Sequence, residues 1–266
     1  MCQLFLSIGD GNGNRKQLLE NFIHKSNLES LKDGYGIAWY QHNKWNIYKN
    51  NIHHIHDTNY NNIIKNIRSN IIIAHLRQVY NSKNKKNLLE EKIIENNHPF
   101  YYKDWVFVLH GDLFFKGKDD VLIFQKYHKE PVFKVLIIKL LNHILPKYKK
   151  MIKGKTDSEI IFYLFLSMWE KLSKEEKEYP KLGLYMCLSQ VLDIIQKCDL
   201  DYSFNFIIAK DKNVLVTNNY HNTSGMFIKK IKLYVNNSID GILICSSKMT
   251  DSSKIIKPNS FLLTDF

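Results

Sequence analysis

The chain has 266 residues, of which 44% are hydrophobic and 13% are aromatic, a composition typical of a globular protein with a sizeable core. The 38 Lys and Arg residues exceed the 26 Asp and Glu residues and give a net charge of +12. Nucleic-acid-binding proteins can carry such a charge. Here, however, the lysines are scattered, and Lys, Asn and Ile are the residues that an AT-rich genome over-supplies, so we expect no specific nucleic-acid partner.

The four cysteines and the apolar segments indicate the compartment. Cysteine spacing shows neither a CxxC pair nor a His at metal-ligand distance, so we expect no metal, no cofactor and a reducing environment. The apolar start Leu4–Ile8 is too short for a signal peptide and follows no basic residues. The longest apolar run, Ile160–Trp169, has about half the length that a membrane-spanning helix needs. These features predict a cytoplasmic protein that does not enter a membrane.

The first part of the chain predicts strands and helices in alternation. Apolar runs and helical spacing of leucines are the signals used. The predicted elements are a strand at Cys2–Ile8, a helix at Arg15–Leu28, a strand ending near Tyr40, a strand at Trp45–Tyr48, a helix at Asn59–Ile67 and a buried strand at Ile71–Arg77.

Three features of this part have both a structural and a functional interpretation. Cys2 is either a buried strand cysteine or, once Met1 is removed, a residue that carries both a nucleophilic thiol and an α-amine that can act as its base. Gly34 and Gly36 either begin a hairpin or let the backbone pass close to another group. Arg77 ends a buried strand, where its guanidinium either reaches solvent or binds a carboxylate. We interpret the neighbouring His75 as a core histidine.

The second part begins with a polar loop at Asn81–Glu91 and a polar and aromatic turn at Glu95–Phe100. A strand follows at Trp105–His110 and closes on Gly111, whose N–H is of the kind that oxyanion holes use, although such a glycine more often only makes a turn. The later predicted elements are a helix at Val132–Leu145 that Pro146 stops, an N-cap at Thr156–Glu159, helices at Ile160–Leu172 and Leu182–Lys197, and strands at Phe204–Ala209, Val214–Thr217, Ile231–Val235, Ile242–Cys245 and Phe261–Leu263.

Six segments in this order resemble the class II glutamine amidotransferases, and most closely their stand-alone γ-glutamyl amidohydrolase branch. The segments are Met1–Cys2, Asp33–Ile37, Ala74–Arg77, Asn96–Phe100, the strand ending in Gly111, and Thr156–Glu159. The resemblance implies an α+β fold of four layers, αββα, in which two antiparallel sheets lie between helical layers, the N-terminal nucleophile hydrolase fold. With no linker or composition break, we predict one domain over residues 1–266.

The resemblance also implies a role for each site residue. Cys2 is the expected nucleophile, and it attacks the γ-carboxamide of glutamine or of another γ-glutamyl compound. Arg77 is expected to bind the α-carboxylate of that substrate and Asp157 its α-ammonium group, although Asp157 also suits a plain N-cap. Gly111 is expected to offer its N–H to the oxyanion. The remaining expected substrate-binding residues, in the pocket wall and the polar turn, are Gly34, Gly36 and His98.

One departure from the family pattern concerns the oxyanion hole. The family sequence His-Asn-Gly is replaced by Leu109-His110-Gly111, so His110 stands where the asparagine side chain supplies the second donor. Losing one such donor costs about 3–4 kcal/mol of transition-state stabilisation. Either His110 replaces the donor, or the enzyme is slow, or the chain is a catalytically reduced homologue that serves as a binding or regulatory subunit. An ammonia acceptor is expected to require a separate synthase or acceptor subunit.

Overall fold

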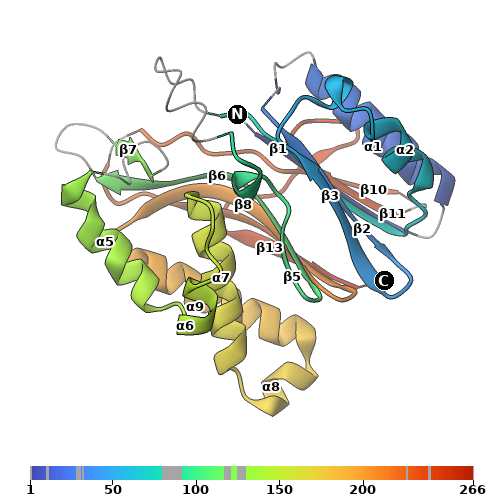
Figure 1. Ribbon diagram of the computed structural model, residues 1–266. Helices are drawn as coiled ribbons and strands as arrows, with labels where there is room; N and C mark the ends of the chain where they lie inside the picture. Colours follow the sequence, from blue (N-terminus) through green and yellow to red (C-terminus); the bar gives the residue numbers. More distant parts are fainter. Residues whose placement is uncertain are drawn as a thin grey trace.

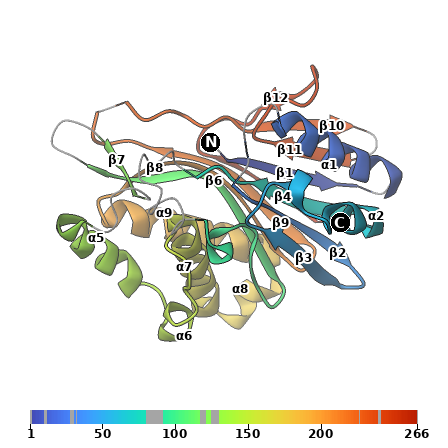
Figure 2. The same ribbon diagram turned by 45° about the horizontal axis from the view of Figure 1, so that its top comes forward.

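The computed structural model describes residues 2–9, 12–27, 31, 33–79, 92–116, 121–124, 130–225, 227–238 and 241–265. Two antiparallel sheets lie face to face in this part of the chain, and helices cover the outer face of each sheet (Figure 1). The view in Figure 2 shows the same four layers from another direction. The predicted α+β fold class and its αββα order are therefore confirmed.

The first sheet contains the start of the chain. Its strands in spatial order are β12 (Lys254–Ile255), β10 (Tyr234–Ser238), β11 (Gly241–Cys245), β1 (Gln3–Ile8), β4 (Ile71–Leu76), β2 (Tyr35–Gln41) and β3 (Lys44–Asn50). β1 pairs with β4 so that Gln3 lies opposite Leu76. This register places the beginning of β1 beside the end of β4, which brings Cys2 to the residues that follow Leu76.

The second sheet is centred on β6 and β8. Its strands in spatial order are β13 (Ser260–Thr264), β9 (Asn213–His221), β8 (Asp201–Lys210), β6 (Trp105–Lys116) and β5 (Phe100–Tyr102), and β7 (Val121–Ile123) pairs with β6. The long β6 shows the alternation of a strand buried on both faces. Phe107 and Leu109 pack against the helices, whereas Val106 and Val108 pack against the first sheet.

The outer faces of the two sheets are covered by different numbers of helices. The helices beside the first sheet are α1 (Asn12–Asn27) and α2 (Tyr60–Asn66), and those beside the second sheet are α5 (Pro131–Asn142), α6 (Pro146–Lys149), α7 (Asp157–Lys171), α8 (Lys174–Glu178) and α9 (Pro180–Lys197) (Figure 1). Short 3-10 helices lie at η1 (His54–His56) and η2 (Ile94–Asn96). In the part of the chain that the structure describes, we find no helix with the length and apolarity needed to cross a membrane.

The predicted N-cap of α7 is confirmed. Thr156 precedes the helix in an extended conformation, and its side chain accepts a hydrogen bond from the N–H of Glu159. This bond satisfies one of the N–H groups that a helix start leaves without an internal partner. Because the cap fixes where the helix begins, it places Asp157 in the first turn, at the edge of the second sheet.

Some predicted boundaries were wrong. The strand expected to close on Gly111 continues to Lys116, because it pairs with β8 as far as Phe114 and with β7 from Phe114 to Lys116. The strand expected at Ile231–Val235 starts only at Tyr234. Pro146 begins the short helix α6 as well as following the end of α5, since the fixed φ of proline suits the first position of a helix. The predicted loop at Asn81–Glu91 lies outside the described residues.

Candidate active site

Cys2 lies directly before β1, where it contacts the residue that follows Arg77. Its Sγ accepts a hydrogen bond from the N–H of Gln78 at 3.4 Å and lies 3.6 Å from the carbonyl oxygen of the same residue. Burial raises the pKa of the Cys2 thiol, while the Gln78 backbone and the charge of Arg77 act in the opposite direction. The resting side chain is therefore a thiol and needs a base before it can act as a nucleophile.

Arg77 follows β4 and is held from two sides. Its N–H donates to the carbonyl of Gly34 at 2.8 Å, and its Nη1 donates to Oδ1 of Asn97 at 3.0 Å. The arginine is only 6% exposed, so its guanidinium is largely withdrawn from water. The amide of Asn97 orients the guanidinium and adds no charge of its own, which suits the binding of a ligand carboxylate.

Gly34, directly before β2, and Gly36, within it, permit a close approach of chain segments, one of the two interpretations that the sequence left open. A Cβ at Gly36 would lie 2.1 Å from the carbonyl oxygen of His98, and a Cβ at Gly34 would lie 2.4 Å from Nδ2 of Asn97. Gly34 also has φ +133°, a conformation that favours glycine. What passes over these glycines is thus the segment from Asn97 to Pro99, in which the side chain of Asn97 bonds to Arg77.

Asp157 begins α7 and connects that helix to the second sheet. Its Oδ2 accepts a hydrogen bond from the N–H of Leu113 at 2.9 Å, and its Oδ1 accepts one from Ser158 at 2.7 Å. Burial raises the pKa of Asp157 and also that of Asp112, and the charge of Asp157 raises the pKa of Asp112 further. A cation bound beside the two carboxyls would favour their ionised forms. An ammonium group is such a cation.

Gly111 and His110 lie within β6. Gly111 has φ +128°, and a Cβ there would lie 2.2 Å from the carbonyl oxygen of Ser203. His110 lies opposite Asn205 of β8 and is 7% exposed. Burial lowers the pKa of His110 to about 3, so at neutral pH its imidazole has one N–H donor and one acceptor nitrogen.

His98, a predicted substrate-binding residue, is buried against another histidine. Its ring centroid lies 4.1 Å from that of His75 and 4.7 Å from that of Phe100. Within the described residues, neither ring nitrogen of His98 has a hydrogen-bond partner. The interpretation of His75 as a core histidine fits its exposure of 1%. The pair packs β4 against the turn before β5.

Most of these groups meet at one end of the sandwich. The charges of Arg77 and Asp112 act on the thiol of Cys2, and the charge of Asp157 acts on the carboxyl of Asp112. The sequence prediction missed Asp112, although it directly follows Gly111, and it gave Asn97 no role, although that residue lies in a quoted motif. Among the side chains that the structure describes, no group of three or more His, Cys, Asp or Glu is placed to hold a metal ion.

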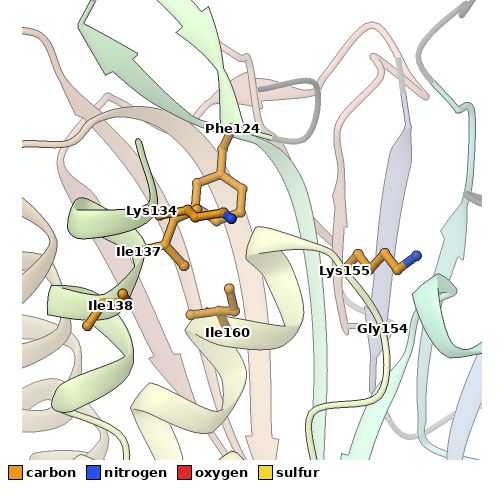
Figure 3. A pocket seen from close by; sticks show the side chains of 7 residues that line it. All are labelled: Phe124, Lys134, Ile137, Ile138, Gly154, Lys155 and Ile160. Carbon is orange, nitrogen blue, oxygen red and sulfur yellow. The ribbon is translucent and has the colours of Figure 1, made fainter. Parts of the chain in front are cut away.

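A separate pocket of about 330 Å³ lies between α5 and the start of α7 (Figure 3). Its apolar lining includes Phe124, Ile137 and Ile160, and the side chain of Lys134 extends towards Phe124 (Figure 3). Gly154 and Lys155 form its opposite border, and they belong to the segment that leads into α7. The pocket therefore adjoins the chain that delivers Asp157.

Comparisons with known proteins identify the family. The family description "Glutamine amidotransferases class-II" matches residues 1–134, half of the chain. The chain belongs to the class II glutamine amidotransferases. A Saccharomyces cerevisiae protein, "Probable glutamine amidotransferase DUG3", is 26% identical over 174 residues, which are 62% of this chain and 42% of that protein. The chain thus spans less than half the length of this curated relative.

Two solved structures share the fold over nearly the whole chain. A glutamine aminotransferase class-II domain protein from Silicibacter pomeroyi is 16% identical with a TM-score of 0.59, over 99% of this chain and 95% of that chain. The glutamine phosphoribosylpyrophosphate amidotransferase from Bacillus subtilis is 12% identical with a TM-score of 0.59, over 100% of this chain and 47% of that chain. The fold is that of the N-terminal nucleophile hydrolases, as the resemblance of the motifs implied.

Proposed function

We propose that the protein releases ammonia from the γ-carboxamide of glutamine or of another γ-glutamyl compound. The observation that supports this most directly is that Cys2 bonds to Gln78, directly after Arg77, and that Asp157 bonds to Leu113, directly after Asp112, whose charge acts on Cys2. Cys2, Arg77 and the two aspartates would supply a nucleophile, a cation for the α-carboxylate and anions for the α-ammonium group. These are the groups needed to hold an amino acid head and attack its side-chain amide.

In the proposed reaction, removal of Met1 makes Cys2 the first residue and frees its α-amine. The amine takes the proton of the thiol, and the thiolate attacks the γ-carbonyl carbon. The tetrahedral intermediate collapses as the C–N bond breaks, and the amine's proton goes to the departing ammonia. Water then attacks the γ-glutamyl thioester under the same base, which breaks the C–S bond, releases the γ-carboxylic acid and returns the thiol.

Gly111 is the proposed backbone donor to the oxyanion, and His110 stands beside it in place of the family's asparagine. The neutral imidazole of His110 has only one N–H to offer. This departure favours one second candidate, a catalytically reduced homologue that retains the fold as a binding or regulatory subunit. An acceptor for the ammonia would come from a separate synthase subunit. We place the reaction in the cytoplasm, a reducing compartment that suits four cysteines without a disulfide.

The experiment is intact-mass measurement before and after incubation with the glutamine analogue 6-diazo-5-oxo-L-norleucine. We expect a mass that lacks methionine and then gains one adduct, as the thiolate displaces dinitrogen from the reagent. The Cys2→Ala variant should gain no adduct, while Cys245→Ala, in which a buried cysteine is removed, should gain one as the native chain does. Retention of Met1, or an unmodified native chain, would overturn the proposed reaction and favour the second candidate.

A further inference from the structure

Two consecutive buried asparagines lie between the proposed carboxylate-binding and ammonium-binding residues. Asn96 ends η2 and is 1% exposed, and Asn97 follows it with an exposure of 0%. We propose that they are positioning residues that fix the separation of Arg77 from Asp157, and so select substrates with an intact α-amino acid head. This inference rests on the proposed function and assigns residues to its specificity.

Asn97 acts on the Arg77 side. Its Oδ1 accepts the 3.0 Å hydrogen bond from Nη1 of Arg77, and its Nδ2 donates to the carbonyl of Asn50 at 2.7 Å. Its own carbonyl accepts a hydrogen bond from Nζ of Lys49 at 2.8 Å. A Cβ at Gly34 would lie 2.4 Å from the same Nδ2, so the amide packs directly on the backbone of Gly34. The direction of the Arg77 guanidinium is therefore set through Asn97 by β3 and by Gly34, which directly precedes β2.

Asn96 acts on the Asp157 side. Its Oδ1 accepts a hydrogen bond from the N–H of Lys155 at 2.9 Å. A Cβ at Gly154 would lie 2.5 Å from the same oxygen, so the two chain segments are in direct contact. Figure 3 shows that the side chain of Lys155 points away from Ile160, one of the residues that line the pocket. Asn96 thus holds the chain two residues before Asp157.

Glu159 strengthens the hold on this segment. Its carboxylate accepts hydrogen bonds from the N–H groups of Lys153 at 3.0 Å and Gly154 at 2.7 Å, while its own N–H donates to Thr156. The loop before α7 is therefore rigid at its start and capped at its end. The dipeptide Asn96–Asn97 then connects Arg77 to the segment before Asp157, so that each proposed charge-binding residue is held by one of the two asparagines. In an α-amino acid both charges are attached to one carbon, so their separation is fixed by covalent geometry and can be matched by a fixed pair of residues.

The experiment compares two competitors that each keep the carboxamide and one of the two charges. Glutaric acid monoamide has the carboxylate without the ammonium group, and 4-aminobutanamide has the ammonium group without the carboxylate. Each competitor's binding constant is obtained from how much it slows alkylation of Cys2 by 6-diazo-5-oxo-L-norleucine in the full chain. With the reagent kept well below its own dissociation constant, the ratio of the alkylation rates without and with competitor depends only on the competitor's concentration and binding constant. A change in the affinity for the reagent itself then cancels.

Each asparagine should affect the binding of a different competitor. Asn97→Ala should weaken glutaric acid monoamide by about tenfold or more and leave 4-aminobutanamide within about twofold, since a charge-assisted contact depends on it. Asn96→Ala should show the reverse. Asn96→Asp retains the oxygen that accepts the hydrogen bond from Lys155 and should restore the binding of 4-aminobutanamide. Asn97→Asp is of equal size and should weaken the binding of glutaric acid monoamide, because it brings a negative charge to Arg77.

Equal changes for both competitors in each variant, or no change in either, would overturn the inference. If an alanine variant does not fold, the aspartate variants give the same decision, because only one of them should weaken glutaric acid monoamide. Wild-type chain that is not alkylated would instead refute the proposed function, and this inference with it. Alkylated wild type with no separation of the competitors refutes the positioning role alone.

Discussion

His110 and Gly111 are adjacent in β6, where the family pattern places an asparagine before the glycine. An amide side chain points its N–H donors in a fixed direction, whereas the neutral imidazole of His110 has one donor whose position depends on the tautomer. We therefore expect His110→Asn to raise kcat for glutamine about tenfold or more, with little change in KM, because the added donor acts on the transition state. Steady-state ammonia release measures both constants.

The same exchange at His75 is the matched control for that variant. His75 is buried like His110 and lies in β4 of the facing sheet, but it has no proposed contact with the oxyanion. His75→Asn should therefore bring no increase in kcat. A fall in kcat for His110→Asn would show that the imidazole itself is the second donor and that this chain has replaced the amide successfully.

At the scale of elements, β2 and the turn before β5 form one support, because two glycines let them touch. Gly36→Ala would place a methyl group 2.1 Å from a backbone oxygen, that of His98, which cannot move as a flexible side chain can. We expect this variant to lower the free energy of unfolding by about 1–3 kcal/mol and to raise KM for glutamine, since Asn97 and Arg77 must shift. Urea unfolding and steady-state kinetics measure the two effects.

Gly225→Ala separates this contact from the general cost of replacing a glycine. Gly225 has φ +73°, and an added Cβ there meets nothing within 4 Å. The Gly225→Ala variant should lower the free energy of unfolding by only about 1 kcal/mol, the cost of a positive φ for a residue with a side chain, without a change in KM. A KM for Gly36→Ala equal to that of the native chain would show that the glycine permits the fold but does not support the site.

At the scale of the molecule, three of the buried histidines, His75, His98 and His110, make folding sensitive to acid. Burial lowers the pKa of His75 and of His110 to about 3 and lowers that of His98 well below its usual value. In the unfolded chain a histidine titrates near pH ~6.5. Between about pH 3 and 6.5 the unfolded chain therefore binds more protons, and the free energy of unfolding falls as the pH falls. The raised pKa values of Asp112 and Asp157 act with the opposite sign.

Removing one of these histidines should flatten the dependence on pH. We expect His75→Gln to reduce the slope of unfolding free energy against pH by about 1.4 kcal/mol per pH unit, the contribution of one proton. Urea unfolding at several values between about pH 6.5 and pH 4.5 gives that slope. The same exchange at the exposed His143 is the control for the effect of the substitution itself. An unaltered slope in His75→Gln would show that this histidine is protonated in the folded chain.

Much of the fold could be predicted because its signals are local. The apolar run Ile71–Ile73 is buried on both faces as strand β4, and Thr156 caps α7 as its position indicated. The continuation of β6 beyond Gly111 could not be predicted, because a glycine ends or continues a strand according to the partner beside it, here β8. The short elements β5 and α6 were missed for the same reason, since they depend on packing rather than on periodicity.

The order of the motifs determined the family, and the residue types determined the expected functional groups of the site: a thiol at position two, a guanidinium at Arg77 and a carboxylate at Asp157. Such information survives in a linear sequence because it requires only identity and order. Tertiary structure alone decided that Asp112 lies near Asp157, that Asn97 bonds to Arg77 and that Asn96 bonds to Lys155. Asn97 lies 20 positions from Arg77 and Asn96 lies 59 from Lys155. No local pattern specifies a hydrogen bond between segments that only the packing of two sheets brings together.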